Sequence, residues 1–258
     1  MSLIQNSQSS QEKPIYYKSI KYISVPEFKE IVINKRDFFV SELVKGYVYI
    51  VKNMIKKDFI ISIRAKVHEF GLKTESSWND TEEGAPNFHQ IDNELNFFKI
   101  KKRAHVYNFF PWNDDTLGIF KIFGEVLELY RIINNNKPIT DENNEEIEIV
   151  NRLQIHHYPS GGGYMGLHTD PDMYLKTICI IYMSEFGKDY YSGGLTLYKD
   201  DVNKLHVDPM VDVGDMVLAY PTIRHGCASI DESKILNWES TEGRWLFLLN
   251  SLPKKKEK

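Results

Sequence analysis

The sequence of 258 residues has little cysteine, no long apolar run and no excess of positive charge. Its two cysteines, Cys179 and Cys227, are too few for a disulfide framework and favour a reducing compartment. No apolar run approaches the roughly 18 residues of a membrane span, and residues 1–20 lack the apolar core of a secretory signal peptide. We therefore expect a cytoplasmic protein that does not act in a membrane.

The charged residues are nearly balanced in sign. The chain has 36 acidic and 32 basic residues, which gives a formal net charge of -4. Nucleic-acid-binding domains commonly carry a basic field, and the sequence has none. We therefore do not expect a nucleic-acid partner.

The first half of the chain alternates between strand-like and helix-like segments. Residues 46–54 and 103–110 are β-rich and apolar, which predicts strands. Residues 56–71 and 114–134 carry apolar side chains at helical spacing, which predicts two helices, with Gly71 as a C-terminal stop for the first. Residues 73–96 are polar and lack periodicity, and a loop of that length is commonly functional or disordered, so the segment is a candidate lid.

The second half of the chain is predicted to form β structure. Short apolar runs separated by Gly, Pro and Asp occur at 150–157, 163–168, 176–183, 194–199, 206–211, 215–220 and 244–250. Such spacing predicts an all-β barrel or sandwich. We expect one domain over residues 1–258: a disordered tail to about residue 13, helical support and lid over 14–148, and a β core over 149–252.

Histidines and aspartates cluster around a Gly-rich turn in "LQIHHYPSGGGYMGLHTDPD", residues 153–172. His168 and Asp170 are two residues apart, and such residues face the same side of a strand. His225 follows the apolar run "DMVLAY" in the segment "PTIRHG". Two histidines and one carboxylate form the facial triad of non-haem Fe(II) oxygenases, so these three residues are the candidate metal ligands.

Four segments in order extend this signal: "YPSGGGYMGLHTD", "SGGLTLY", "VDVGDMVLAYPTIRHG" and "EGRWLFLLN". They resemble the core of the Fe(II)/2-oxoglutarate-dependent oxygenases, in the branch of the prolyl-hydroxylase-like enzymes. The resemblance covers roughly residues 150–252. It implies a double-stranded β-helix (jelly-roll) core in a mainly β, α+β fold, with the N-terminal helices packed on one sheet.

The resemblance also implies roles for individual residues. His168, Asp170 and His225 match the iron ligands, and Arg244 matches the basic residue that binds the distal carboxylate of 2-oxoglutarate. A guanidinium suits that task because it donates two parallel hydrogen bonds to a carboxylate. Tyr158 matches a tyrosine that donates to the co-substrate carboxylate, although a core tyrosine would look the same.

One departure from the family pattern affects Arg244. It follows His225 by 19 residues, a longer gap than in the prolyl-hydroxylase-like enzymes, and residues 231–242 form the insertion. Arg224 is a poorer candidate for the carboxylate, since a direct neighbour of His225 on a strand should point the other way.

The candidate substrate contacts come from several segments. Trp78, Phe88 and His89 lie in the predicted lid, Tyr107 lies on a predicted strand, and His156 shares strand parity with Tyr158. Thr177 and Tyr182 are further candidates for the pocket wall.

The implied cofactors are Fe(II), 2-oxoglutarate as co-substrate, and O2. Because Asp170 is present, where related halogenases have a small residue, hydroxylation is favoured over halogenation. We expect a hydroxylase of a small polar metabolite or amino acid that releases succinate and CO2. The alternatives are a prolyl-type protein side-chain hydroxylase, a non-catalytic β-barrel binding module, and a cupin enzyme. Cupins usually supply a His-x-His pair and a Glu, which this spacing does not match.

Overall fold

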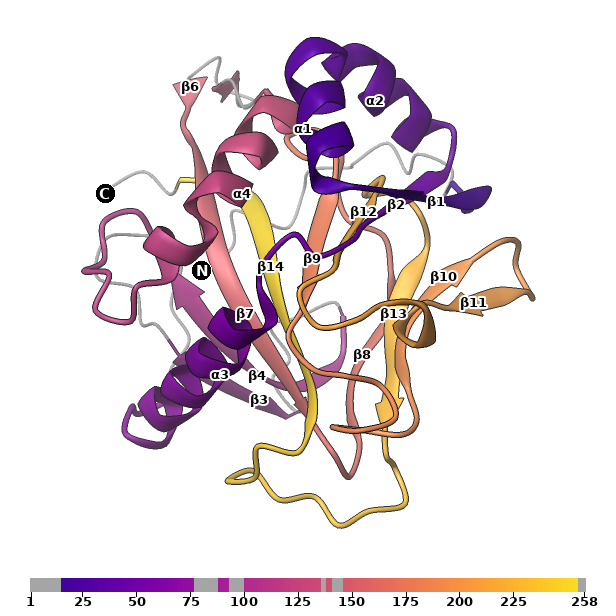
Figure 1. The fold of residues 1–258 in the computed structure, drawn as a ribbon. Coiled ribbons are helices and arrows are strands. Elements are labelled where there is room, and N and C mark those ends of the chain that lie inside the picture. Colours follow the sequence, from indigo (N-terminus) through magenta and orange to yellow (C-terminus); the bar gives the residue numbers. More distant parts are fainter. Residues whose placement is uncertain (1–14, 77–87, 93–99, 136–137, 141–145, 255–258) are drawn as a thin grey trace.

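The computed structural model describes residues 15–76, 88–92, 100–135, 138–140 and 146–254 (Figure 1). Twelve of the fourteen strands among these residues belong to one large sheet. The strands are β1 (Ser19–Ile23), β2 (Tyr47–Val51), β3 (Phe88–Asp92), β4 (Lys102–Phe109), β5 (Ile139–Thr140), β6 (Glu146–Ile147), β7 (Ile149–Pro159), β8 (Gly163–His168), β9 (Ile178–Tyr182), β10 (Gly194–Tyr198), β11 (Lys204–His206), β12 (Met216–Ala219), β13 (His225–Ile230) and β14 (Gly243–Pro253).

Twelve strands pair in the order β1-β2-β12-β9-β14-β7-β4-β8-β13-β10-β11, with β3 beside β4. β5 and β6 pair separately. The longest pairing joins β7 to β14 antiparallel, with Arg244 opposite Tyr158, Leu246 opposite His156, and Asn250 opposite Arg152. Because side chains alternate across a strand, this register decides which residues of both strands share a face.

Four helices occur among the described residues: α1 (Val25–Asn34), α2 (Arg36–Val44), α3 (Lys57–Leu72) and α4 (Ile119–Asn134). A capping box begins α1, where Ser24 and Glu27 satisfy each other's backbone N–H groups. Gly118 precedes α4 in the left-handed conformation (φ 74°), which separates the helix from the turn before it. Figure 1 shows α1, α2 and α4 gathered together, and α3 beside β3 and β4.

Helices α3 and α4 cover one face of the sheet. On α4, the Phe123 ring stacks on Phe247 of β14 with centroids 3.7 Å apart. On α3, a Cβ at Gly71 would lie 2.7 Å from the Tyr107 ring, so glycine allows this helix to approach β4. Since Phe247 faces these helices, its neighbours Leu246 and Leu248 on β14 face the opposite side.

The predicted mainly β fold is confirmed, and the predicted helix over 56–71 corresponds closely to α3. Gly71 does not end that helix, which continues to Leu72. The helix expected over 114–134 begins only at Ile119. No helix in the described part of the chain is long and apolar enough to cross a membrane.

Several segments differ from the sequence prediction, among them β13, which lies outside the apolar runs from which strands were predicted. Strand β1 and helices α1 and α2 occupy a region for which no element was predicted. The run at 206–211 is not a strand: β11 ends at His206, and a 3-10 helix spans Asp208–Met210. The predicted lid, residues 73–96, contains β3, which pairs with β4, while residues 77–87 and 93–96 lie outside the described residues.

Candidate metal centre

Three predicted side chains meet where β8 ends and β13 begins. His168 is the last residue of β8, His225 is the first residue of β13, and the strand register places them opposite each other. Asp170 follows two residues later, and its backbone N–H donates to the carbonyl of Pro221 at 2.9 Å. Candidate ligand atoms of His168, Asp170 and His225 all lie within 4.8 Å of one another.

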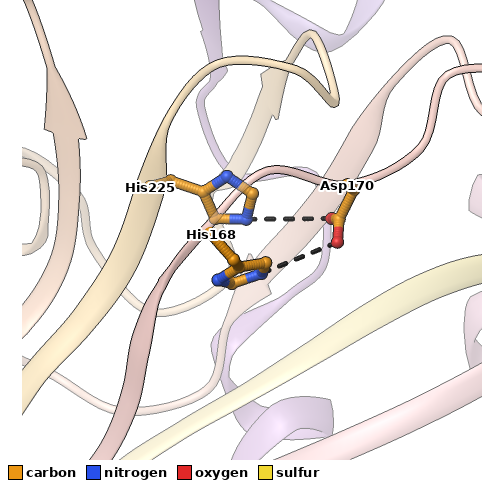
Figure 2. Close-up of side chains that lie close together, drawn as sticks. All are labelled: His168, Asp170 and His225. Atoms are coloured by element: carbon orange, nitrogen blue, oxygen red, sulfur yellow. Dashed lines mark ion pairs between the residues drawn. The ribbon is translucent and has the colours of Figure 1, made fainter. Parts of the chain in front are cut away.

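The carboxylate of Asp170 faces both imidazoles, as Figure 2 shows. Its Oδ1 lies 3.6 Å from Nε2 of His168, and its Oδ2 lies 3.7 Å from Nε2 of His225. These separations exceed hydrogen-bond distances. They suit three atoms that share a cation between them.

The second nitrogen of each imidazole fixes the tautomer. Nδ1 of His168 lies 2.9 Å from the Gly166 carbonyl, and Nδ1 of His225 lies 2.7 Å from the Ile223 carbonyl. A carbonyl only accepts, so each Nδ1 carries the proton and each Nε2 presents its lone pair toward Asp170. Burial, and then His225, lower the pKa of His168 to about 4, which keeps this imidazole neutral near pH 7.

This donor set fits a divalent first-row metal ion. Two imidazoles and one carboxylate on one side of an ion leave further positions open, which is the arrangement of non-haem Fe(II) oxygenases. The backbone carbonyls behind both histidines orient the rings before any metal binds.

A cavity of about 210 Å³ adjoins the three residues. Strands β7 and β14 contribute more of its lining residues than any other strands, from the face opposite helices α3 and α4. Six of the residues that line it are Gln154, His156, Tyr158, Arg244, Leu246 and Leu248.

Arg244 lies at one end of this cavity and is held in a buried ion pair. Its Nε donates to Oδ2 of Asp208 at 2.6 Å, and its Nη2 donates to Oδ1 at 3.2 Å. Tyr182 and Tyr190 also donate to Asp208, at 2.5 and 2.6 Å. Burial alone would lower the pKa of Arg244, but the Asp208 carboxylate holds it well above the ordinary value. Asp208 was not predicted from the sequence, although an aspartate inside an apolar run signals a buried partner.

Tyr158 lies opposite Arg244 on β7 and lines the same end of the cavity. Its ring centroid is 5.8 Å from Cζ of Arg244. Its hydroxyl lies 3.3 Å from Nδ1 of His156 and 3.5 Å from Sδ of Met165. Burial raises the pKa of Tyr158, so the hydroxyl stays protonated and available as a donor.

The remaining predicted pocket residues divide into several groups. His156 and Thr177 line the cavity, whereas Tyr182 donates to Asp208. Tyr107 does not line the cavity: it alternates with Val106, which does, and stacks on Trp245 at 6.0 Å on the other face. Trp78 lies outside the described residues, and for Phe88 and His89 the structure describes the backbone only.

Two cations that were not predicted as site residues also line the cavity, namely Lys102 of β4 and Arg152 of β7. Burial lowers the pKa of Arg152 to about 10. Burial, and then the nearby charge of Arg152, lower the pKa of Lys102 to about 8. Arg152 lies an even number of residues from His156 and Tyr158 on the same strand. Its side chain could therefore have been predicted to face the same side as theirs.

No family model and no curated protein matches the chain. Solved structures do match its fold. A Pseudomonas putida prolyl-4-hydroxylase is 12% identical, with a TM-score of 0.51, over 86% of this chain and 100% of that chain. A Trichoplax adhaerens prolyl hydroxylase, in complex with a hypoxia inducible factor oxygen degradation domain peptide fragment, is 13% identical, with a TM-score of 0.51, over 87% and 91% of the two chains.

A third structure carries bound small molecules. This full-length Neurospora crassa protein, in complex with alpha-KG (2-oxoglutarate) and 5-formyluracil, is 16% identical, with a TM-score of 0.53, over 92% of this chain and 86% of that chain. At identities this low, the structural similarity establishes the fold alone. The chemistry must be argued from the residues of the site. The chain therefore has the fold of the Fe(II)/2-oxoglutarate-dependent oxygenases, the superfamily that its four sequence motifs resemble.

Proposed function

We propose that the protein is an Fe(II)- and 2-oxoglutarate-dependent dioxygenase. In this proposal it hydroxylates an aliphatic C–H bond of a small polar metabolite or amino acid and releases succinate and CO2. The convergence of His168, Asp170 and His225 beside a cavity carries the proposal. We further infer that the β core is a double-stranded β-helix, since β8 and β13, which carry the two histidines, pair across one end of the cavity.

His168, Asp170 and His225 would hold Fe(II) through two Nε2 atoms and a carboxylate oxygen. The bound metal, with 2-oxoglutarate and O2, supplies the oxidising chemistry that inserts oxygen into a C–H bond. The chain's own contribution is to orient both imidazoles through the carbonyls of Gly166 and Ile223, direct each Nε2 lone pair toward the metal, and enclose the reacting groups.

Arg244 and Tyr158 would anchor the distal carboxylate of 2-oxoglutarate. Asp208 engages Nε and Nη2 of Arg244, so Nη1 is the nitrogen of the guanidinium that Asp208 does not engage. The Tyr158 hydroxyl offers a second donor from the opposite strand. Because Asp208 holds the guanidinium rigid, little side-chain entropy would be lost when the carboxylate binds.

The alternative function is hydroxylation of a protein side chain. The Trichoplax adhaerens structure favours it, because that prolyl hydroxylase is in complex with a peptide fragment. The two functions differ in substrate size. A free amino acid fits wholly inside a small cavity, whereas a peptide must extend beyond it.

Succinate formation from 2-oxoglutarate in the presence of Fe(II), ascorbate and air tests the proposal. We expect one or more compounds from a panel of free amino acids and small polar metabolites to raise succinate formation above the level without substrate. Asp170→Asn should abolish this formation, and Asp58→Asn, at an exposed position on α3, should leave it unchanged. Stimulation by proline-containing peptides alone would favour the alternative, and equal succinate formation by Asp170→Asn would refute the proposed metal site.

A further inference from the structure

The cavity has a positively charged end that the proposed mechanism does not use. Arg152 lies opposite Asn250, six residues along β7 from Tyr158, which lies opposite Arg244. Among the described residues, no carboxylate forms an ion pair with Arg152. Its Nη2 lies 3.1 Å from the side-chain oxygen of Gln154, in the amide orientation that satisfies both groups, and its Cζ lies 5.9 Å from the Phe110 ring centroid.

Lys102 and His156 line the same cavity as Arg152. Burial, and then the charge of Arg152, lower the pKa of Lys102. The pKa of His156 is far below its ordinary value because of burial and then the charges of Lys102, Arg152 and Arg244. His156 is therefore neutral beside two cations.

One nitrogen of His156 indicates that a ligand belongs here. Its Nε2 is buried, lacks a hydrogen-bond partner among the described residues, and belongs to a side chain that lines the cavity. Its Nδ1 lies 3.3 Å from the Tyr158 hydroxyl, whose other neighbour is the weakly accepting sulfur of Met165. If the hydroxyl donates to Nδ1, the better acceptor, Nε2 carries the ring proton and is a donor.

The two ends of the cavity differ in net charge. At the Arg244 end, Asp208 already balances the guanidinium. At the other end, Arg152 keeps a charge that no described carboxylate balances. A buried cation is costly without a counter-charge, so this end suits an anionic ligand more strongly than the Arg244 end does.

We propose that Arg152, Lys102 and His156 bind a carboxylate group, and that this carboxylate belongs to the primary substrate. The substrate class is then a small carboxylic acid, which includes the carboxylate of a free amino acid. The carboxylate site follows from the cavity alone. Its assignment to the substrate rests on the proposed function, in which Arg244 takes the distal carboxylate of 2-oxoglutarate.

Binding of butyrate and butyramide to the metal-free protein tests the carboxylate site without relying on activity. The two probes have nearly the same shape and differ in charge, and ligand binding is measured from the increase in melting temperature. We expect butyrate to raise the melting temperature and butyramide to leave it unchanged. Arg152→Gln should weaken butyrate binding roughly 10- to 100-fold, the effect of a lost charge-assisted hydrogen bond. Arg131→Gln, at an exposed arginine on α4, should bind butyrate like the wild type.

Arg152→Lys keeps the positive charge, so it provides a second variant if Arg152→Gln does not fold. It should bind butyrate more tightly than butyramide. Equal binding of the two probes by the wild type, or undiminished butyrate binding by Arg152→Gln, would overturn the carboxylate site.

Anaerobic titration of the Fe(II)-loaded protein with 2-oxoglutarate identifies the source of the carboxylate. We expect Arg152→Gln to bind 2-oxoglutarate with wild-type affinity, measured by visible absorption. If this variant instead loses affinity for 2-oxoglutarate by the same factor as for butyrate, the site holds the co-substrate and the substrate assignment is wrong. If even the wild type shows no 2-oxoglutarate binding while butyrate binding depends on Arg152, the proposed function fails and the carboxylate site stands.

Discussion

The buried ion pair between Asp208 and Arg244 yields a sharp stability prediction. The two side chains are 0% and 1% exposed, so solvent does not screen their interaction. Asp208→Asn preserves the shape of the side chain, but it leaves the guanidinium of Arg244 without a counter-charge. Removal of one partner of a buried pair costs about 3–5 kcal/mol, because the other charge remains buried and unpaired. That loss is a large part of the roughly 5–15 kcal/mol of a typical domain.

The hydrogen bonds around Asp208 increase the expected loss. Its two oxygens accept from Arg244, from the hydroxyls of Tyr182 and Tyr190, and from the backbone N–H of Leu195 at 3.0 Å. Asparagine has one carbonyl oxygen, and its amide nitrogen would face donors. At least one hydroxyl or guanidinium N–H would then lose its acceptor.

Urea unfolding of the purified protein measures this loss. Asp208→Asn should lose about 3–5 kcal/mol, whereas Asp201→Asn, which breaks an exposed pair with Arg224, should change stability by less than about 1 kcal/mol. The double variant Asp208→Asn/Arg244→Met should recover part of the loss, since it removes the unpaired charge. A loss below about 1 kcal/mol in Asp208→Asn would refute the reasoning that this pair is buried and charged.

Three further predictions concern the metal ligands, pH and backbone. His168→Ala should lose Fe(II) binding in anaerobic equilibrium dialysis, whereas His206→Ala, at an exposed histidine, should retain it. Wild-type Fe(II) affinity in both variants would exclude His168 as a metal ligand. Burial, and then a neighbouring histidine, lower the pKa of His105 from 6.5 to about 4. The unfolded chain therefore takes up a proton there first, so stability should fall as pH drops from 6.5 towards 4. His105→Gln should flatten that decline in urea unfolding at several pH values, and an equally steep decline would contradict this assignment. Gly194 has φ +107°, and a Cβ would lie 2.1 Å from the buried carboxylate of the ion pair. Gly194→Ala should therefore lower the melting temperature; Gly124→Ala, in open space on α4, should raise it slightly, and equal effects would argue against crowding at Gly194.

The proximity of the candidate metal ligands was predictable because their signal is local. The spacing of His168 and Asp170 at a strand end places both side chains on one side, whatever the rest of the fold does. Prediction of His225 as the third ligand required more information, namely the order of four motifs along the chain. Helix α3 was predictable for a similar reason, since its buried residues recur at helical spacing.

The partners of buried charges could not be predicted because they depend on long-range register. Arg244 was expected to face a bound carboxylate, and its additional ion pair with Asp208, from 36 residues away, was not predicted. Asp208 belongs to a 3-10 helix in a segment where a strand was expected over 206–211. The same limit applies to Tyr107. Its strand was predicted, but which face it occupies depends on pairing between β4 and β7.

The N-terminal elements show a missed local signal. Ser24 and Glu27 form a capping box followed by an amphipathic segment, and this sequence pattern predicts the start of helix α1. Helix α2 is harder to find, because its buried positions include Glu42, which pairs with Lys21 and Lys45. A buried glutamate interrupts the apolar periodicity on which helix prediction depends.

The most direct test of the account is visible absorption of the protein under anaerobic conditions, with Fe(II) present and 2-oxoglutarate added in steps. The account predicts a weak metal-to-ligand charge-transfer band that grows with 2-oxoglutarate and saturates, and that is absent in Asp170→Asn. Bound iron without such a band would contradict the proposed co-substrate and indicate another metal-dependent chemistry. Failure to bind iron at all would contradict the metal centre itself and leave a binding module on this fold.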